Sequence, residues 1–141
     1  MTILVDTSVW SLALRRDAEA DEPEVQALKD ARLGDAVVVT TGLVLQELLQ
    51  VFSGPKAQAQ IVQRFTSLPL IQPDRDDHIG AAGIRNICRR AGVQVGTIDA
   101  LLAQLCIRHE LTLLTTDQDF VHAAKQCALS VWPAKPRARK P

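Results

Sequence analysis

The stretch Met1-Thr2-Ile3-Leu4-Val5-Asp6-Thr7-Ser8 decides how the chain folds. Its first five residues form an apolar run without polar alternation, which is typical of a strand buried on both faces of a parallel sheet. Open sheets of this kind bind ligands at the carboxyl ends of their strands, and Asp6 directly follows this strand. Asp6 taken alone is equally compatible with an ordinary turn residue. Thr7 and Ser8 are good N-cap residues for a helix that begins at Val9.

The same arrangement recurs near the end of the chain. Residues 111–114 form a second apolar strand, and the segment Thr115-Thr116-Asp117-Gln118-Asp119 follows it. Two strands that each deliver an acid at their carboxyl end suggest a metal site.

Strands and helices alternate between these two segments. The pattern predicts strands at 1–5, 36–39, 70–71, 111–114 and 129–132. It predicts helices at 9–16, 24–33, 42–52, 56–68, 74–91 and 98–109, and a last helix that ends at about 127. Strands separated by helices indicate a layered α/β fold with a mainly parallel sheet.

Several of these helices carry apolar residues that we expect to face inward. The expected inward residues are Val25, Leu28 and Leu33, then Leu43, Val44, Leu48 and Val51, then Ile61, Val62 and Phe65, and finally Ile79, Ala82, Ile84, Ile87 and Cys88. Gly80 and Gly83 weaken the prediction of a helix at 74–91, unless they let a neighbouring element approach closely. Thr97 is an N-cap candidate for the helix at 98–109.

The length of 141 residues fits a single domain. We expect this domain at 1–132 and a basic, proline-rich, disordered tail at 133–141. The chain has 16 basic and 16 acidic residues, which argues against nucleic acid, whose binders tend to be basic. If five acids gather around metal, however, 16 positive charges remain against 11 negative ones, so the net charge does not decide the partner.

The cysteines and the hydropathy pattern indicate an intracellular protein. Cys88, Cys106 and Cys127 are widely spaced without a paired motif, so we expect buried, reduced thiols and no zinc site. No apolar stretch is long enough to cross a membrane. The N-terminus lacks the pattern of a signal peptide, and we expect a cytoplasmic location.

Two further acids lie on helices among apolar neighbours. Glu47 shares its side of the helix with Leu48 and other apolar residues, where a charge is costly unless it is paired or bound to metal. An ion pair with an arginine is the alternative for Glu47. Asp99 falls in the first turn of its helix, where the helix dipole alone also favours an acid.

Asp6, Glu47, Asp99 and Asp117 can meet at one edge of such a sheet. Clustered carboxylates raise one another's pKa, and Mg²⁺ or Mn²⁺ relieves that repulsion because these ions prefer oxygen ligands. A site of this kind suits the hydrolysis of phosphodiester bonds. No phosphate-binding glycine loop is present, and His78, His109 and His122 are scattered, so we interpret these histidines as surface residues. Three arginines of the helix at 74–91 form either a solvated face or a contact to backbone phosphates, namely Arg85, Arg89 and Arg90.

Four segments together resemble a known family. They are Val5-Asp6-Thr7-Ser8-Val9-Trp10, Glu47-Leu48, Ile98-Asp99-Ala100-Leu101-Leu102-Ala103 and Leu114-Thr115-Thr116-Asp117-Gln118-Asp119-Phe120. In order and spacing they resemble the motifs of PIN-domain ribonucleases, above all the VapC toxins of VapBC toxin–antitoxin modules. The resemblance covers residues 1 to about 132.

This resemblance implies a three-layer α/β/α sandwich around a parallel sheet. It implies Mg²⁺- or Mn²⁺-dependent endonucleolytic cleavage of RNA, often tRNA or rRNA, and a cognate VapB-like antitoxin. It further implies a homodimer and a toxin–antitoxin hetero-oligomer. The matching acids are Asp6, Glu47, Asp99 and Asp117, with Asp119 as an accessory acid, and the matching hydroxyl residues are Thr7, Ser8 and Thr116.

We therefore expect a toxin ribonuclease. Asp6, Asp99 and Asp117 would hold metal, Asp119 would support a second ion, and Glu47 would orient the ion or activate water. One alternative is a PIN-like module that binds RNA or protein without cleaving. Another is a phosphatase of the haloacid-dehalogenase kind, which needs a second acid where this chain has Ser8.

Overall fold

The computed structural model describes residues 1–15 and 22–133. The predicted end of the first helix at Arg16 and the part of the predicted tail from 134 onward lie outside the described residues. Within the described part the strands are β1 (Thr2–Val5), β2 (Val37–Thr41), β3 (Leu70–Ile71), β4 (Thr112–Leu114) and β5 (Ser130–Val131). The helices are α1 (Thr7–Leu14), α2 (Pro23–Leu33), α3 (Gly42–Val51), α4 (Pro55–Thr66), α5 (Arg75–Arg90), α6 (Thr97–Arg108) and α7 (Gln118–Ala123).

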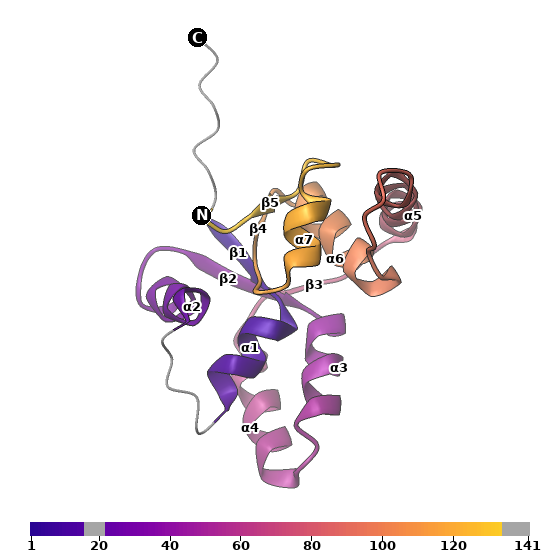
Figure 1. Ribbon diagram of the computed structural model, residues 1–141. Helices are drawn as coiled ribbons and strands as arrows, with labels where there is room; N and C mark the ends of the chain where they lie inside the picture. Colours follow the sequence, from indigo (N-terminus) through magenta and orange to yellow (C-terminus); the bar gives the residue numbers. More distant parts are fainter. Residues whose placement is uncertain (16–21, 134–141) are drawn as a thin grey trace.

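All strand pairs of the sheet are parallel, in the order β3-β2-β1-β4-β5. The chain first moves outward from β1 to β2 and β3, and then returns to β4 and β5 on the other side of β1. Because parallel crossovers are right-handed, α1 to α4 cover one face of the sheet and α5 to α7 cover the other, as Figure 1 shows. The predicted α/β/α sandwich with a parallel sheet is therefore confirmed.

The central strands β1 and β4 are buried on both faces, as their apolar sequences predict. Leu4, Val5, Leu113 and Leu114 are completely buried. Val5 pairs with Leu114, so the two strands end side by side. The order of the strands reverses between β1 and β4, and open α/β sheets bind ligands at such a reversal. The acids that follow these strands thus share the expected binding edge.

Several element boundaries differ from the prediction. Helix α1 begins at Thr7 with Asp6 as its N-cap, and α6 begins at Thr97 with Gly96 as its N-cap. Asp6 takes extended backbone angles while its carbonyl oxygen accepts from Val9 N, so the helix begins directly after the strand. Helix α7 ends at Ala123, four residues short of the expected end.

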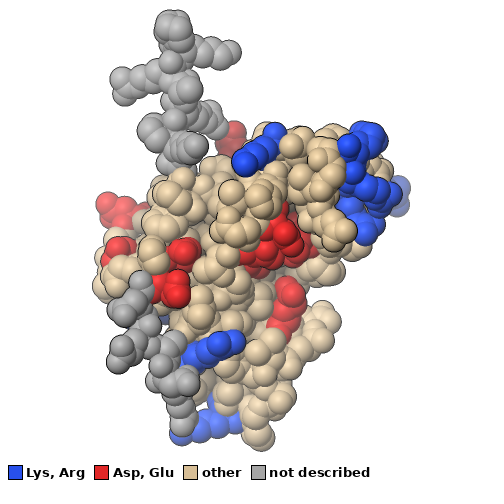
Figure 2. Space-filling view, in the orientation of Figure 1, with Lys and Arg blue, Asp and Glu red and all other residues tan. Residues whose placement is uncertain are grey.

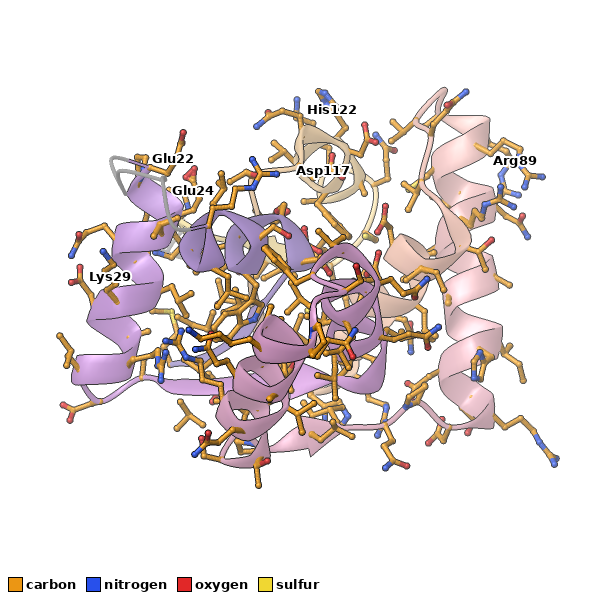
Figure 3. All side chains as sticks on the ribbon, turned by 90° about the horizontal axis from the view of Figure 1, so that it is seen from below. Glu22, Glu24, Lys29, Arg89, Asp117 and His122 are labelled. Carbon is orange, nitrogen blue, oxygen red and sulfur yellow. The ribbon has the colours of Figure 1, made fainter. Side chains whose placement is uncertain are left out.

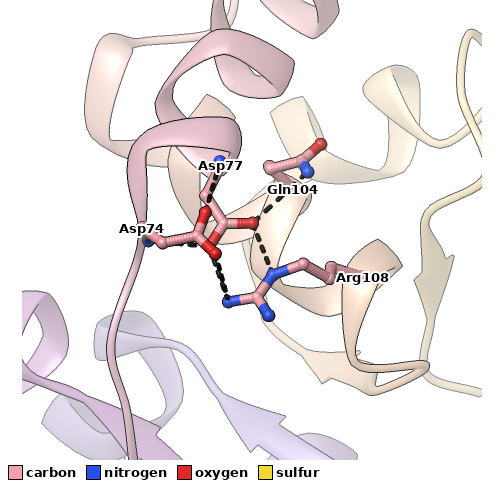
Figure 4. A network of polar contacts seen from close by, with 4 residues as sticks. All are labelled: Asp74, Asp77, Gln104 and Arg108. Carbon is pink, nitrogen blue, oxygen red and sulfur yellow. Dashed lines mark hydrogen bonds and ion pairs between the residues drawn. The ribbon is translucent and has the colours of Figure 1, made fainter.

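Helix α5 packs on α6 through a narrow stripe that contains a buried acid. The stripe consists of Asp77, Ala81, Ile84 and Cys88, which recur once per turn. Asp77 is fully buried, and Arg108 of α6 donates to both of its oxygens, from Nε to Oδ1 and from Nη2 to Oδ2, each at 2.6 Å (Figure 4). Gln104 Nε2 lies 3.4 Å from Oδ1, and Asp74 forms a capping box with Asp77. This network holds the two helices together.

Six residues expected to face inward, on α5 and on three other helices, are exposed instead. Each lies beside a buried stripe that spans only part of its helix, so its side chain reaches solvent: Leu33, Val51, Val62, Ile79, Ala82 and Ile87. Gly80 does allow a close approach, because a Cβ atom there would meet the Gln104 side chain at 2.5 Å. Gly83 has no neighbour within 4 Å and serves no such purpose.

Candidate active site

Asp6 is held in place by two hydroxyl groups at the carboxyl end of β1. Its side chain is buried, and Oδ2 accepts hydrogen bonds from Ser8 Oγ at 2.9 Å and from Thr115 Oγ1 at 2.8 Å. Asp6 N donates to Leu114 O at 2.9 Å, which continues the pairing of β1 with β4. One carboxylate oxygen is thus fixed by neutral donors, and Oδ1 remains available to a ligand.

Thr115 links this carboxylate to the segment that carries the next acid. Its buried Oγ1 donates to Asp6 and accepts from Asp117 N at 3.0 Å. Ser8 Oγ makes a parallel link, because it accepts from Thr116 N at 3.1 Å. The turns after β1 and β4 are therefore joined through hydroxyl groups, and the spacing of Asp6 and Asp117 is set by both turns.

Asp117 and Asp119 begin α7. Asp117 is the N-cap of this helix, and its Oδ1 accepts from Asp119 N at 2.9 Å. Asp117 is partly buried, whereas Asp119 is exposed. Figure 3 shows Asp117 near His122, at the α7 end of the molecule. Asp117 thus keeps one oxygen for the helix and one for another partner.

Glu47 reaches the same edge from α3. Its Oε1 accepts from Thr7 Oγ1 at 3.1 Å. The predicted alternative, an ion pair with an arginine, is wrong for the described residues, where the ion pairs join Arg108 to Asp74 and Asp77. Thr7 and Ser8 therefore both contact acids of the cluster, Thr7 with Glu47 and Ser8 with Asp6.

Asp99 completes the cluster from the first turn of α6. The pKa of Asp99 is raised to about 6, first by burial and then by the negative charges of four other acids, which are in decreasing order Asp6, Asp117, Glu47 and Asp119. The other four predicted acids therefore all lie near enough to Asp99 for their charges to act on it. Acidic atoms gather at the centre of the face in Figure 2. Beneath the cluster, burial and the charge of Asp6 raise the pKa of Cys106 to about 12.

The donor set fits a hard divalent cation in its chemistry. It consists of carboxylate oxygens that repel one another and have no basic partner among the described residues. In this structure no three His, Cys, Asp or Glu side chains of the described residues converge closely enough to hold an ion as they stand. Binding would therefore require these side chains to move toward a shared ion.

The remaining predicted residues lie around this cluster. Thr116 contacts it through its backbone N–H, and a role for its hydroxyl stays a prediction. His78, His109 and His122 are exposed, as predicted. Cys88 and Cys106 are buried thiols and Cys127 is partly buried, all without disulfides. Arg85, Arg89 and Arg90 are exposed on α5.

Thr115 is the residue of the site that sequence reasoning missed. It stands two residues before Asp117, and its hydroxyl accepts from Asp117 N, which is the pattern of a threonine turn. A threonine at this distance before an acid, at the end of a buried strand, is the signal that identifies such a hydroxyl.

Comparison with known proteins agrees with the fold. The PIN domain family model matches residues 3–126. Ribonuclease VapC11 of Mycobacterium tuberculosis and VapC ribonuclease Mb1587 of Mycobacterium bovis are each 31% identical over 120 residues, which cover 84% of this chain and 88% of the relative. The chain belongs to the PIN-domain family, together with these VapC ribonucleases.

Solved structures with the same fold include toxin–antitoxin complexes. FitAB bound to the IR36 DNA fragment has a TM-score of 0.73 and 21% identity, over 98% of this chain and 99% of that chain. VapBC2 of Rickettsia felis, bound to a DNA fragment from its promoter, has a TM-score of 0.70 and 18% identity, over 93% and 97%. VapC20 of Mycobacterium tuberculosis, a toxin that cleaves the sarcin-ricin loop, has a TM-score of 0.65 and 21% identity, over 90% and 98%.

None of the helices formed by residues 1–15 and 22–133 has the length and apolar character needed to cross a membrane.

Proposed function

We propose that this protein is a metal-dependent endoribonuclease and the toxin of a toxin–antitoxin pair. The observation that carries the proposal is the gathering of Asp6, Glu47, Asp99 and Asp117 at the carboxyl edge of the sheet without a basic partner. The ribonuclease relatives at 31% identity support the same activity. RNA, in particular tRNA or rRNA, is the proposed substrate.

Asp6, Asp99 and Asp117 would hold Mg²⁺ or Mn²⁺, and Asp119 would support a second ion. When bound there, such an ion polarises a phosphate oxygen and neutralises the charge that develops during hydrolysis. Ser8 and Thr115 both donate to Oδ2 of Asp6 and so hold the carboxylate group in one orientation. Its other oxygen, Oδ1, is thereby also held in place.

Glu47 is suited to orient or deprotonate the attacking water. Thr7 donates to its Oε1, which leaves Oε2 to accept a hydrogen from water. Glu47 is partly buried, so water can reach it. The in-line attack of water on phosphorus then breaks the bond to the leaving ribose oxygen.

The proposed partner is a VapB-like antitoxin that blocks the acidic cluster, with a toxin homodimer inside a hetero-oligomer. The structural neighbours support this proposal, since several are VapBC or FitAB assemblies. A phosphatase of the haloacid-dehalogenase kind finds no support, because Ser8 occupies the position of its second acid and bonds to Asp6.

Induction of the protein in a bacterial host tests the proposal. We expect the wild type to arrest growth and to produce discrete new RNA ends, and Asp6→Asn to do neither. Asp35→Asn is the matched control, because Asp35 is an exposed acid on the loop between α2 and β2. Arrest by Asp6→Asn with the same RNA ends would contradict the catalytic role, and arrest without new ends would indicate toxicity by binding alone.

A further inference from the structure

A basic hollow lies beside the acidic cluster. It has a volume of about 540 Å³ and is lined by Arg85 and Arg89 of α5 and by the loop of residues 92–96. In Figure 2 the basic atoms at the α5 side of the molecule lie on the same face as the central acidic area. Arg90 also belongs to α5 but does not line the hollow. Of the three arginines on α5, two therefore line the hollow and the third does not.

The loop of residues 92–96 joins this hollow to the acids. Residues 92–94 of the loop also line a second hollow of about 360 Å³ together with Asp119 and His122. At the end of the loop, Oδ2 of Asp99 lies 3.8 Å from the place where a Cβ on Gly96 would stand. A chain that leaves the acidic cluster across this loop thus arrives at Arg85 and Arg89.

The two arginines keep charge available for a ligand. Arg85 Nε donates to Val95 O at 3.0 Å, which fixes the side chain against the loop and leaves its terminal nitrogens to other partners. Neither Arg85 nor Arg89 forms an ion pair with the acids of the described residues. Gly92 has a φ of +77° and open space around it, so the backbone of the loop is approachable.

We propose that the RNA strand leaving the acidic cluster crosses the loop of residues 92–96, and that Arg85 and Arg89 bind its phosphates. This inference rests on the proposed function, because it extends the path of a strand whose scissile phosphate lies at the acids. The cluster itself repels phosphates, so positive charge beside it is needed to hold the polyanion. The hollow is lined without aromatic side chains, which favours contact with the backbone over base stacking.

The binding of a short fluorescein-labelled single-stranded RNA to the full-length protein tests this inference. Chelator in the buffer prevents cleavage, and fluorescence anisotropy gives Kd over a series of salt concentrations. Arg89→Gln should raise Kd by roughly threefold to tenfold and lower the salt slope by roughly 0.7, the value for one lost phosphate contact on a single strand. Arg90→Gln removes the same charge one residue away and should leave both quantities unchanged.

Arg85→Gln should act like Arg89→Gln, and its melting temperature controls for the lost bond to Val95. Equal effects of Arg89→Gln and Arg90→Gln would overturn the proposal, since binding would then depend on general charge. The proposal would also be overturned if the wild type did not bind the RNA. A glutamate-rich peptide serves as a second anionic probe, and a loss of peptide binding in Arg89→Gln without a loss of RNA binding would overturn the proposal as well.

Cleavage kinetics separate this inference from the proposed function. With Mg²⁺ present, Arg89→Gln should raise KM and leave kcat nearly unchanged, because its contact lies away from the reacting phosphate. If the wild type bound RNA through Arg89 without cleaving it, the proposed function would fail and the binding path would stand. Normal cleavage by the wild type with no change of KM in Arg89→Gln would reject the path and retain the function.

Discussion

Two buried threonines near the carboxyl ends of β2 and β4, the strands on either side of β1, differ in what their hydroxyl groups contact. Thr115 Oγ1 bonds to Asp6 and to the backbone of Asp117, whereas Thr40 Oγ1 is buried without a hydrogen-bond partner among the described residues. A buried hydroxyl stabilises a protein only when it is bonded. The same substitution, threonine to valine, should therefore have opposite effects at these two positions.

Thr115→Val should lower the rate of RNA cleavage by about tenfold to 100-fold, the usual range for a residue that orients a metal-binding side chain. The change keeps the shape of the residue but frees Oδ2 of Asp6 and the N–H of Asp117. Single-turnover cleavage assays measure this effect, and circular dichroism checks the fold. A Thr115→Val protein that cleaves at the wild-type rate would show that the bond to Asp6 does not position the acid.

Thr40→Val should raise the free energy of unfolding by about 1 kcal/mol, because it removes an unsatisfied buried hydroxyl. Denaturant titration measures this difference, and the cleavage rate should stay unchanged. A loss of stability would indicate that the hydroxyl is satisfied in solution, for example by a bound water molecule.

At the scale of single residues the sequence predicted the acids better than the hydroxyl groups that hold them in place. Asp6 and Asp117 stand directly after apolar strands, so their positions follow from the strand pattern. The role of Thr115 depends on the pairing of β1 with β4, which brings its hydroxyl to Asp6 across more than 100 positions of sequence. The bond from Asp117 N to Thr115 is local and has a sequence signal, whereas the bond from Thr115 to Asp6 depends on the pairing of distant strands and leaves no local pattern.

Helix α5 contains two glycines with different surroundings. Gly83 is exposed with open space around it, so Gly83→Ala should stabilise the protein by about 1 kcal/mol through helix propensity. Gly80→Ala should gain less or lose stability, because its new methyl group must displace the Gln104 side chain. Thermal denaturation of both variants measures the difference, and equal gains would mean that the contact of α5 with α6 at Gly80 is loose.

The buried ion pair between α5 and α6 predicts how stability depends on pH. The hydrogen bonds from Arg108 are the largest cause that lowers the pKa of Asp77 to about 2. Burial opposes them by raising the pKa, and the hydrogen bond from the Asp74 backbone helps to lower it. Because the folded pKa lies below the ordinary value of 3.8, the ionised form stabilises the folded state above about pH 4. This contribution disappears as the pH falls through about 2.

Asp77→Asn should reduce stability near neutral pH by about 2 kcal/mol, since Arg108 loses a charged partner. The same variant should lose less stability than the wild type when the pH falls from about 4 to 2, because it lacks the titrating group. Urea titrations at several pH values test both effects. Parallel pH profiles of the two proteins would refute the assignment of the low pKa to Asp77.

At the scale of elements the order of strands and helices could be predicted, but the width of the buried faces could not, least of all on α5. Ile79 and Ile87 are exposed on α5 although both are apolar. The face that α5 buries is decided by Asp77, whose partner Arg108 lies on another helix. A buried acid that belongs to the stripe, as Asp77 does, makes the stripe difficult to recognise from apolar periodicity.

In the whole molecule the reversal of strand order between β1 and β4 gathers acids from four distant parts of the chain. The sheet delivers Asp6 and Asp117, while α3 and α6 add Glu47 and Asp99 from opposite faces. The sequence predicted this gathering through the alternation of strands and helices. The net charge of zero concealed it, because acids at one edge balance basic residues such as those on α5.

The measurement that tests the central claim most directly is cleavage of RNA by the purified protein with and without divalent metal. We expect cleavage in Mg²⁺ or Mn²⁺, loss of cleavage in chelator, and recovery when metal is restored. Asp99→Asn should reduce cleavage by at least about 100-fold while its melting temperature stays at or above that of the wild type, since one repulsive charge is removed. Cleavage that survives chelator, or an Asp99→Asn protein as active as the wild type, would contradict the account of the acids as a metal-dependent active site.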